Sequence, residues 1–242
     1  MLVAVVSDIH SNLAAFQAVL ADLPAVDEVW CLGDIVGYGP DPNECLETLL
    51  GYKHLAIAGN HDWACVGKAD LSLFNPDAQA ASLWTASQLT EENKEILRRL
   101  PSEMTVGDFT LAHGSPRDPV WEYIMQPSQA VANLSYFTSR YCLVGHTHVP
   151  AVFWGPAGGQ PAGSARPAPD TALEIGERRL IINPGSVGQP RDGDPRASYV
   201  VLDLAQRLAR FHRVPYDVAA TQAKMRQAGL PYMLWARLAA GW

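Results

Sequence analysis

Short runs of apolar residues that stop abruptly at polar residues and glycine recur through the first 150 positions of the chain. The runs are rich in Val, Leu, Ile and aromatic side chains, which is typical of buried β-strands. We therefore predict strands over residues 2–6, 28–32, 54–58, 109–112 and 141–144.

Helix signals lie between and after the early strands. Leu13, Phe16, Leu20 and Leu23 recur at helical spacing and stop before a proline, and other helices open on Asp-Pro, Asn-Pro or a capping threonine. The predicted helices cover residues 13–23, 41–50, 75–89, 90–99 and 216–228. Strand–helix–strand alternation in the first 60 residues implies right-handed parallel crossovers and therefore an α/β fold.

The second half of the chain has closely spaced strands, predicted over residues 149–154, 171–175, 178–182, 199–204 and 208–214. Their short connections favour a more antiparallel sheet there. Residues 155–170 contain four glycines and four prolines, a composition that cannot pack a core, so we predict a mobile hairpin loop and not a domain linker. We expect residues 1–242 to form one domain.

Composition narrows the class of protein. The chain of 242 residues is 48% hydrophobic and 18% charged, as in globular proteins. Its net charge of -7, without a Lys/Arg run longer than two, argues against nucleic-acid polymers as partners but leaves small phosphates open. No cationic leader and no apolar stretch near 18 residues is present, and the four cysteines have no CxxC spacing. We expect a cytoplasmic protein with reduced core thiols and no membrane span; self-association stays open.

Histidine, aspartate and asparagine residues, whose side chains can bind metal ions, come directly after the predicted strands. Five of the seven histidines do so, namely His10, His61, His113, His146 and His148. Asp8, Asp34 and Asn60 stand among them. Since the carboxyl ends of strands meet in one crevice of an α/β sheet, these side chains should converge. In extended backbone, residues two apart point the same way, so the pairs Asp8/His10 and His146/His148 should each direct two donors to one point.

Carboxylate oxygen and imidazole nitrogen without thiolate suit Mn, Fe, Ni or Zn, with Mn as our first expectation, and do not suit a structural cysteine zinc site. The candidate donors exceed the needs of one catalytic ion and fit two divalent ions. Two divalent ions carry a charge of +4, and the carboxylates of Asp8 and Asp34 carry -2. The net charge of about +2 in the site favours the binding of an anionic phosphate.

Five blocks in order resemble the motifs of the calcineurin-like metallophosphoesterase superfamily, in its branch of small bacterial and archaeal phosphodiesterases. The blocks are Asp8-Ile9-His10, Gly33-Asp34, Gly59-Asn60-His61-Asp62, His113-Gly114 and Gly145-His146-Thr147-His148. Residues 183–191 resemble a later segment that is common in this branch. The resemblance implies a four-layer αββα sandwich of two mixed β-sheets flanked by helices.

The resemblance also implies a role for each matched residue. Asp8, His10 and His148 look like ligands of one ion, and Asn60, His113 and His146 look like ligands of the other. Asp34 looks like the bridge between the ions, and His61 like the histidine that acts near the leaving group without binding metal.

One departure bears on the substrate. Protein phosphatases of this superfamily and the symmetrical dinucleoside-polyphosphate hydrolases carry an arginine in the loop after Gly-Asp, where this chain has Gly37 and Tyr38. We therefore expect a phosphodiesterase that hydrolyses small phosphodiester or nucleotide substrates by in-line attack of a metal-bridging hydroxide. Asn12, Tyr38 and Arg191 are the candidate substrate contacts. The alternatives are a phosphomonoesterase or protein phosphatase, and a non-catalytic scaffold of the same fold.

Overall fold

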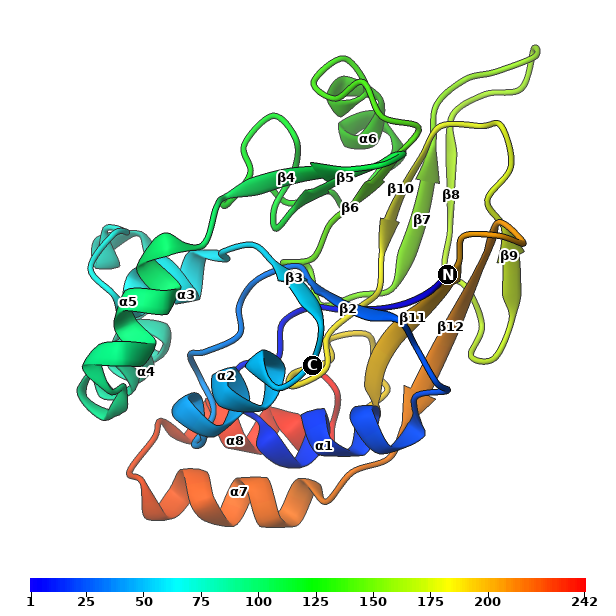
Figure 1. Cartoon of the computed structure of the whole chain (residues 1–242). Helices are drawn as coiled ribbons and strands as arrows, with labels where there is room; N and C mark the ends of the chain where they lie inside the picture. The colour runs from blue at the N-terminus through cyan, green and yellow to red at the C-terminus, as the bar shows by residue number, and fades with distance from the viewer.

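Two six-stranded β-sheets stack at the centre of the protein, which is described over residues 1–242 by a computed structural model (Figure 1). The first sheet has the strand order β3-β2-β1-β11-β12-β9, and the second has the order β4-β5-β6-β10-β7-β8. The strands are β1 (Leu2–Val6), β2 (Glu28–Cys31), β3 (His54–Ala56), β4 (Glu103–Val106), β5 (Phe109–Ala112), β6 (Tyr141–Leu143), β7 (Ala151–Trp154), β8 (Gly163–Ala165), β9 (Ala172–Glu174), β10 (Leu180–Asn183), β11 (Ala197–Asp203) and β12 (Leu208–Val214).

Helices cover the outer faces of the sheets and one end of the sandwich (Figure 1). The α-helices are α1 (Leu13–Asp22), α2 (Pro42–Leu50), α3 (Asn60–Cys65), α4 (Pro76–Gln88), α5 (Glu91–Arg99), α6 (Pro127–Asn133), α7 (Val218–Gln227) and α8 (Tyr232–Ala236), with short 3₁₀ turns at Leu71–Leu73 and Arg237–Ala239.

Alternating side chains of each strand build the layers. Along β1, Val3 and Val5 join the core between the two sheets, whereas Ala4 and Val6 join the core under the helices, together with Phe16 of α1. This is the period of two that a strand imposes on its side chains. The helix α6 packs on the outer face of the second sheet, against β7. The predicted four-layer sandwich is confirmed.

Both sheets are mixed. The strands β1, β2 and β3 are parallel, as are β5, β6 and β10, and all other pairs are antiparallel. From the short connections we expected the strands of the second half to form a sheet of their own. Instead, they are divided between the two sheets. The strand β11, buried along nearly its whole length, pairs with β1 in the middle of the first sheet, because a strand apolar on both faces is most stable there.

Several short elements were missing from the sequence prediction, namely α3, β4, α6, β8 and α8. The strand β8 lies inside the Gly/Pro-rich stretch 155–170 and pairs antiparallel with β7, so that stretch is partly ordered into a hairpin. The four cysteines are buried and form no disulfide bonds.

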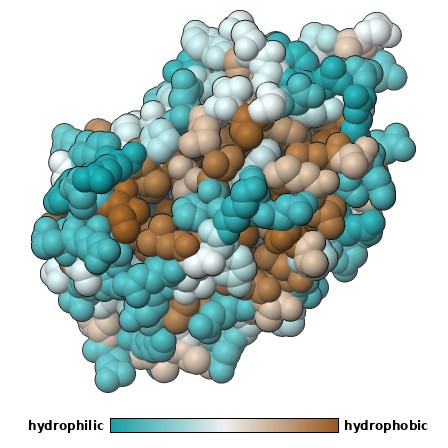
Figure 2. Space-filling view, in the orientation of Figure 1, coloured by the Kyte–Doolittle hydropathy of each residue, from teal (hydrophilic) through white to brown (hydrophobic).

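No helix combines the length and the apolar character that a crossing of the lipid bilayer requires. Figure 2 shows hydrophilic side chains over most of the face seen in Figure 1, with hydrophobic side chains gathered across its middle.

Candidate metal centre

The carboxyl ends of strands from both sheets meet at one place in the structure. Asp8 follows β1, Asp34 follows β2 and Asn60 begins α3 beyond β3. From the second sheet, His113 follows β5, and His146 and His148 follow β6. These residues and His10 are buried, with at most 4% of each exposed. The expected crevice therefore exists, but two stacked sheets form it and not the edge of one.

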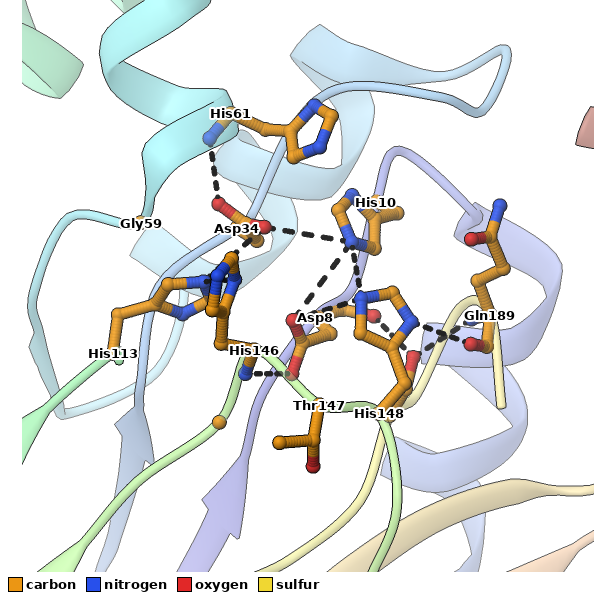
Figure 3. A network of polar contacts seen from close by, with 12 residues as sticks. Asp8, His10, Asp34, Gly59, His61, His113, His146, Thr147, His148 and Gln189 are labelled. Carbon is orange, nitrogen blue, oxygen red and sulfur yellow. Dashed lines mark hydrogen bonds and ion pairs between the residues drawn. The ribbon is translucent and has the colours of Figure 1, made fainter. Parts of the chain in front are cut away.

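Asp8, His10 and His148 form the first group of donors (Figure 3). The Nε2 atoms of His10 and His148 lie 3.1 Å apart, and Asp8 Oδ1 lies 3.2 Å from His148 Nε2 and 3.8 Å from His10 Nε2. The Nδ1 atoms face the backbone oxygens of Val36 (3.3 Å) and Gln189 (2.6 Å), which only accept hydrogen bonds. Each Nδ1 therefore carries the ring proton, and the lone pairs of both Nε2 atoms point to one place.

Asp34, His113 and His146 form the second group. His113 donates from Nδ1 to the Leu32 oxygen at 2.8 Å, and its Nε2 lies 3.1 Å from His146 Nδ1 and 3.3 Å from Asp34 Oδ2. The same Oδ2 atom lies 3.6 Å from Nε2 of His10 in the first group. Asp34 thus stands between the two groups (Figure 3).

The donor set fits divalent ions. Buried polar atoms normally have partners, yet Asp8 Oδ1 and Asn60 Oδ1 have no hydrogen bond. Lone pairs of imidazole and carboxylate that face one another at these distances repel unless a cation lies between them. Nitrogen and oxygen donors without sulfur match first-row divalent metals. The carbonyl groups that fix the imidazole tautomers are the usual outer partners of metal-binding histidines.

The electrostatics of the protein alone favour the neutral, metal-binding form of three of the four histidines in the two groups, but not of His113. Burial lowers the pKa of His10, His146 and His148, so these rings are neutral at neutral pH, the form that binds metal. Burial opposes a charge on His113 too, but the Asp34 carboxylate outweighs it and raises the His113 pKa to about 9. Burial raises the pKa of Asp8 to about 7. An ionised Asp8 is therefore costly without a nearby cation.

The pairing expected for His146 and His148 was wrong, since they belong to different groups. The cause is the backbone. Positive φ angles occur at Asp8 (53°), His10 (48°), His146 (64°) and His148 (60°), so these segments are tight turns and not extended chain. In such turns, side chains two residues apart need not point the same way: Asp8 and His10 converge, whereas His146 and His148 do not.

A cavity of about 170 Å³ opens over the two groups. His61 lines it, with a buried Nδ1 that has no partner, and its ring packs 4.2 Å from that of Tyr38. Burial lowers the pKa of His61 to about 4, so the imidazole is neutral at neutral pH. Gly37 has a φ of +92°, and a Cβ there would lie 2.9 Å from the His61 ring, so glycine allows this close packing.

The three candidate substrate contacts have different surroundings. Asn12 accepts hydrogen bonds from Ala15 N and Thr221 Oγ1 and donates one to Gly188 O, so its amide joins α1 to two other segments. It is buried and does not line the cavity. Tyr38 lines the cavity but is only 7% exposed.

Arg191 also lines the cavity. Its guanidinium bonds Gln189 Oε1 at 2.7 Å and lies 5.9 Å from the centre of the Tyr38 ring. The neighbouring Asp192 and Asp194 pair with other arginines. The Arg191 guanidinium, from a segment far away in the sequence, therefore lies beside Tyr38. Tyr38 belongs to the loop that lacks the arginine found in protein phosphatases of the superfamily.

Two further residues of the block Gly59-Asn60-His61-Asp62 hold other site residues in place. Asp62 accepts hydrogen bonds from Gly59 N (2.9 Å) and Val36 N (3.1 Å), which ties the loops that carry Asn60 and Asp34. A Cβ on Gly59 would lie 2.0 Å from Asp34 Oδ1.

We therefore expect Gly59→Ala to displace the Asp34 carboxylate and to weaken metal binding roughly 10–100-fold, the usual cost of disturbing such a supporting contact. Isothermal titration calorimetry of the apoprotein with Mn²⁺ measures the metal affinity. Gly176→Ala is the matched control, because nothing lies within 4 Å of a Cβ there. Equal affinity in the two variants would show that Gly59 does not support the site.

The model of the calcineurin-like phosphoesterase superfamily domain matches residues 1–207. The chain belongs to this superfamily. The phosphoesterase match includes every residue of both donor groups. Residues 208–242, which form β12, α7 and α8, follow it.

Several proteins are similar to this phosphoesterase. A metallophosphoesterase from Sphaerobacter thermophilus is 48% identical, with all of this chain and 99% of that one covered and a TM-score of 0.92. An uncharacterized protein of Methanocaldococcus jannaschii is 37% identical over 99% of this chain and 98% of its own length. A symmetrical bis(5'-nucleosyl)-tetraphosphatase from Pectobacterium carotovorum is 32% identical over 125 residues, which are 48% of this chain and 44% of that protein.

Proposed function

We propose that this phosphoesterase uses two divalent ions to hydrolyse small phosphodiesters, including those of nucleotides. The observation that carries the proposal is the pair of buried donor groups, with Asp34 between them, at the base of one cavity. When bound, two such ions activate water and neutralise the charge of the phosphoryl group.

Within this proposal, the donor groups divide the ligands. Asp8, His10 and His148 would hold one ion, and His113 and His146 would hold the other with Asn60, whose unpaired Oδ1 also lines the cavity. Asp34 would bind both, because one of its oxygens lies within 3.6 Å of a nitrogen from each group. Mn²⁺ is our first choice among Mn, Fe, Ni and Zn, all of which bind nitrogen and oxygen donors.

His61 would act on the leaving group. Its ring faces the cavity and its backbone N–H donates to Asp34 Oδ1 at 2.8 Å, so the residue is fixed to the centre without its side chain joining either group. From this place the neutral imidazole would donate a hydrogen bond to the departing oxygen and stabilise the negative charge that develops on it.

Arg191 would bind a non-bridging phosphate oxygen. It is the one arginine or lysine in the cavity lining, which favours a diester, with its single negative charge, over a monoester dianion. We expect Arg191→Gln to raise KM roughly 10–100-fold through the loss of a charge-assisted hydrogen bond, with the metal content unchanged. Steady-state kinetics and metal analysis measure both. Arg210→Gln, on the exposed side of β12, is the matched control. An unchanged KM would remove Arg191 from the substrate site.

Hydrolysis of an aryl diester, an aryl monoester and cyclic nucleotides, each with Mn²⁺, Ni²⁺, Mg²⁺ and Zn²⁺, tests the proposal. We expect the highest kcat/KM for a diester and no turnover after chelation. Faster turnover of the monoester would favour the phosphomonoesterase alternative. No turnover of any substrate with any metal would favour the non-catalytic scaffold.

A further inference from the structure

Aromatic side chains from loops far apart in the sequence line the cavity beyond the donor groups. Tyr38 comes from the loop between β2 and α2, Phe74 from the segment before α4, and Trp121 and Tyr123 from the loop between β5 and α6. We call Phe74, Trp121 and Tyr123 the aromatic slot. None of its three members belongs to the motifs at the strand ends.

The slot is continuous with His61. The rings of His61 and Phe74 lie 5.0 Å apart and those of Phe74 and Trp121 lie 5.3 Å apart, both in edge-to-face contact. On the other side, Tyr123 stacks on His146 at 3.9 Å with an angle of 17° between the rings. Aromatic side chains therefore extend from His61 and from His146, a donor of the second group.

The slot is held in place before any ligand arrives. Glu122, between Trp121 and Tyr123, accepts hydrogen bonds from Ser115 Oγ and Asn133 Nδ2 and pairs with Arg117. This network fixes the backbone that carries both rings, so little conformational entropy is lost on binding. Tyr123 nevertheless remains 43% exposed and Trp121 is only partly buried, so both rings present surface that nothing in the chain covers.

The size of the cavity limits what enters it. About 170 Å³ is less than the roughly 300–1,000 Å³ that encloses a drug-sized ligand. The space suits a phosphoryl group with one ring system, and the remainder of a larger substrate would lie outside. Planar rings gain offset-stacked and edge-to-face contacts with such walls, which an alkyl group of equal size does not gain.

We propose that the aromatic slot binds a planar aromatic ring on the leaving group of the phosphoester, a nucleobase or a simple aryl group. The inference rests on the proposed function and narrows its substrate class. The ring lies on the leaving-group side because the slot begins at His61. Trp121 and Phe74 are then specificity-determining residues of this site.

The test compares phosphodiesters with aryl and alkyl leaving groups in the wild type, Trp121→Leu and Trp121→Phe, all loaded with Mn²⁺. We expect Trp121→Leu to lower the aryl-to-alkyl ratio of kcat/KM about 10-fold, mainly through KM, and Trp121→Phe to restore most of it. Trp154→Leu, at the end of β7 and outside the cavity lining, is the matched control. An unchanged ratio in Trp121→Leu would overturn the proposal.

A binding measurement separates this proposal from the proposed function. Chelator-treated protein is titrated with adenosine monophosphate, phenyl phosphate and ribose 5-phosphate, with tryptophan fluorescence as the readout. We expect the two aromatic ligands to bind more tightly than ribose 5-phosphate, and Trp121→Leu to remove the difference. Tighter adenosine monophosphate identifies a nucleobase and tighter phenyl phosphate a simple aryl group. Equal affinities of all three overturn the slot even if the enzyme is active, whereas ring-dependent binding without any hydrolysis overturns only the function.

Discussion

Asp34→Asn should abolish phosphoesterase activity and remove most of the bound metal. The substitution keeps the shape of the side chain but loses the negative charge that lies between the two donor groups, 3.3 Å from His113 and 3.6 Å from His10. Bound metal contributes several kcal/mol of transition-state stabilisation, so activity should fall at least about 1,000-fold. Metal analysis after dialysis, together with hydrolysis of an aryl diester, measures both effects.

Asp108→Asn is the control for this prediction, because Asp108 is exposed in the turn between β4 and β5. Circular dichroism separates a loss of metal from a loss of fold. Should Asp34→Asn keep two ions per chain, the shared carboxylate would have to be sought elsewhere, and Asp8 is the other buried carboxylate within the two groups.

His61→Gln should behave differently, with turnover lost and metal retained. The backbone N–H of residue 61, which bonds Asp34, is unaffected by the substitution, and the side chain belongs to neither donor group. Help to the leaving group from a positioned side chain is typically worth about 10²–10⁴-fold, so kcat should fall by that factor for an alkyl leaving group. The loss should be much smaller for p-nitrophenol, which leaves as an anion without a proton.

The dependence on leaving group is the decisive measurement for His61. A uniform loss over alkyl and aryl leaving groups would mean that the imidazole orients the substrate. A parallel loss of metal would make His61 a ligand. Phe74 and Tyr38 pack against the His61 ring, so substitutions of these two residues are not suitable controls. The control is His54→Gln, because His54 lies at the start of β3 and outside the cavity.

The strands and their polar ends could be predicted because they depend on local patterns. The strands β1, β5 and β12 begin and end at the predicted residues. The exposed strand β4 was missed because its sequence, Glu103-Met104-Thr105-Val106, lacks a buried run. The helix α3 was missed because it begins directly at Asn60, among the polar residues of the site.

The finer geometry of the site could not be predicted because it depends on contacts between distant segments. Arg191 reaches Tyr38 across more than 150 positions of sequence, and Trp121 reaches Phe74 from another loop. The apolar pattern therefore gave no sign of the cation beside Tyr38, which comes from a segment far away in the sequence. The separation of His146 from His148 depends on a backbone conformation that the apolar pattern does not report.

The left-handed conformation of Asp8, His10, Asp34, His146 and His148 has a consequence for protein engineering. Each such residue costs on the order of 1 kcal/mol relative to relaxed backbone, and the net stability of a folded domain is only about 5–15 kcal/mol. In a library selected for heat resistance alone, glycine at these five positions would relieve the backbone strain, and variants that lose metal donors would not be removed. Thermostable variants are better sought on the outer helices, with the five turns held constant.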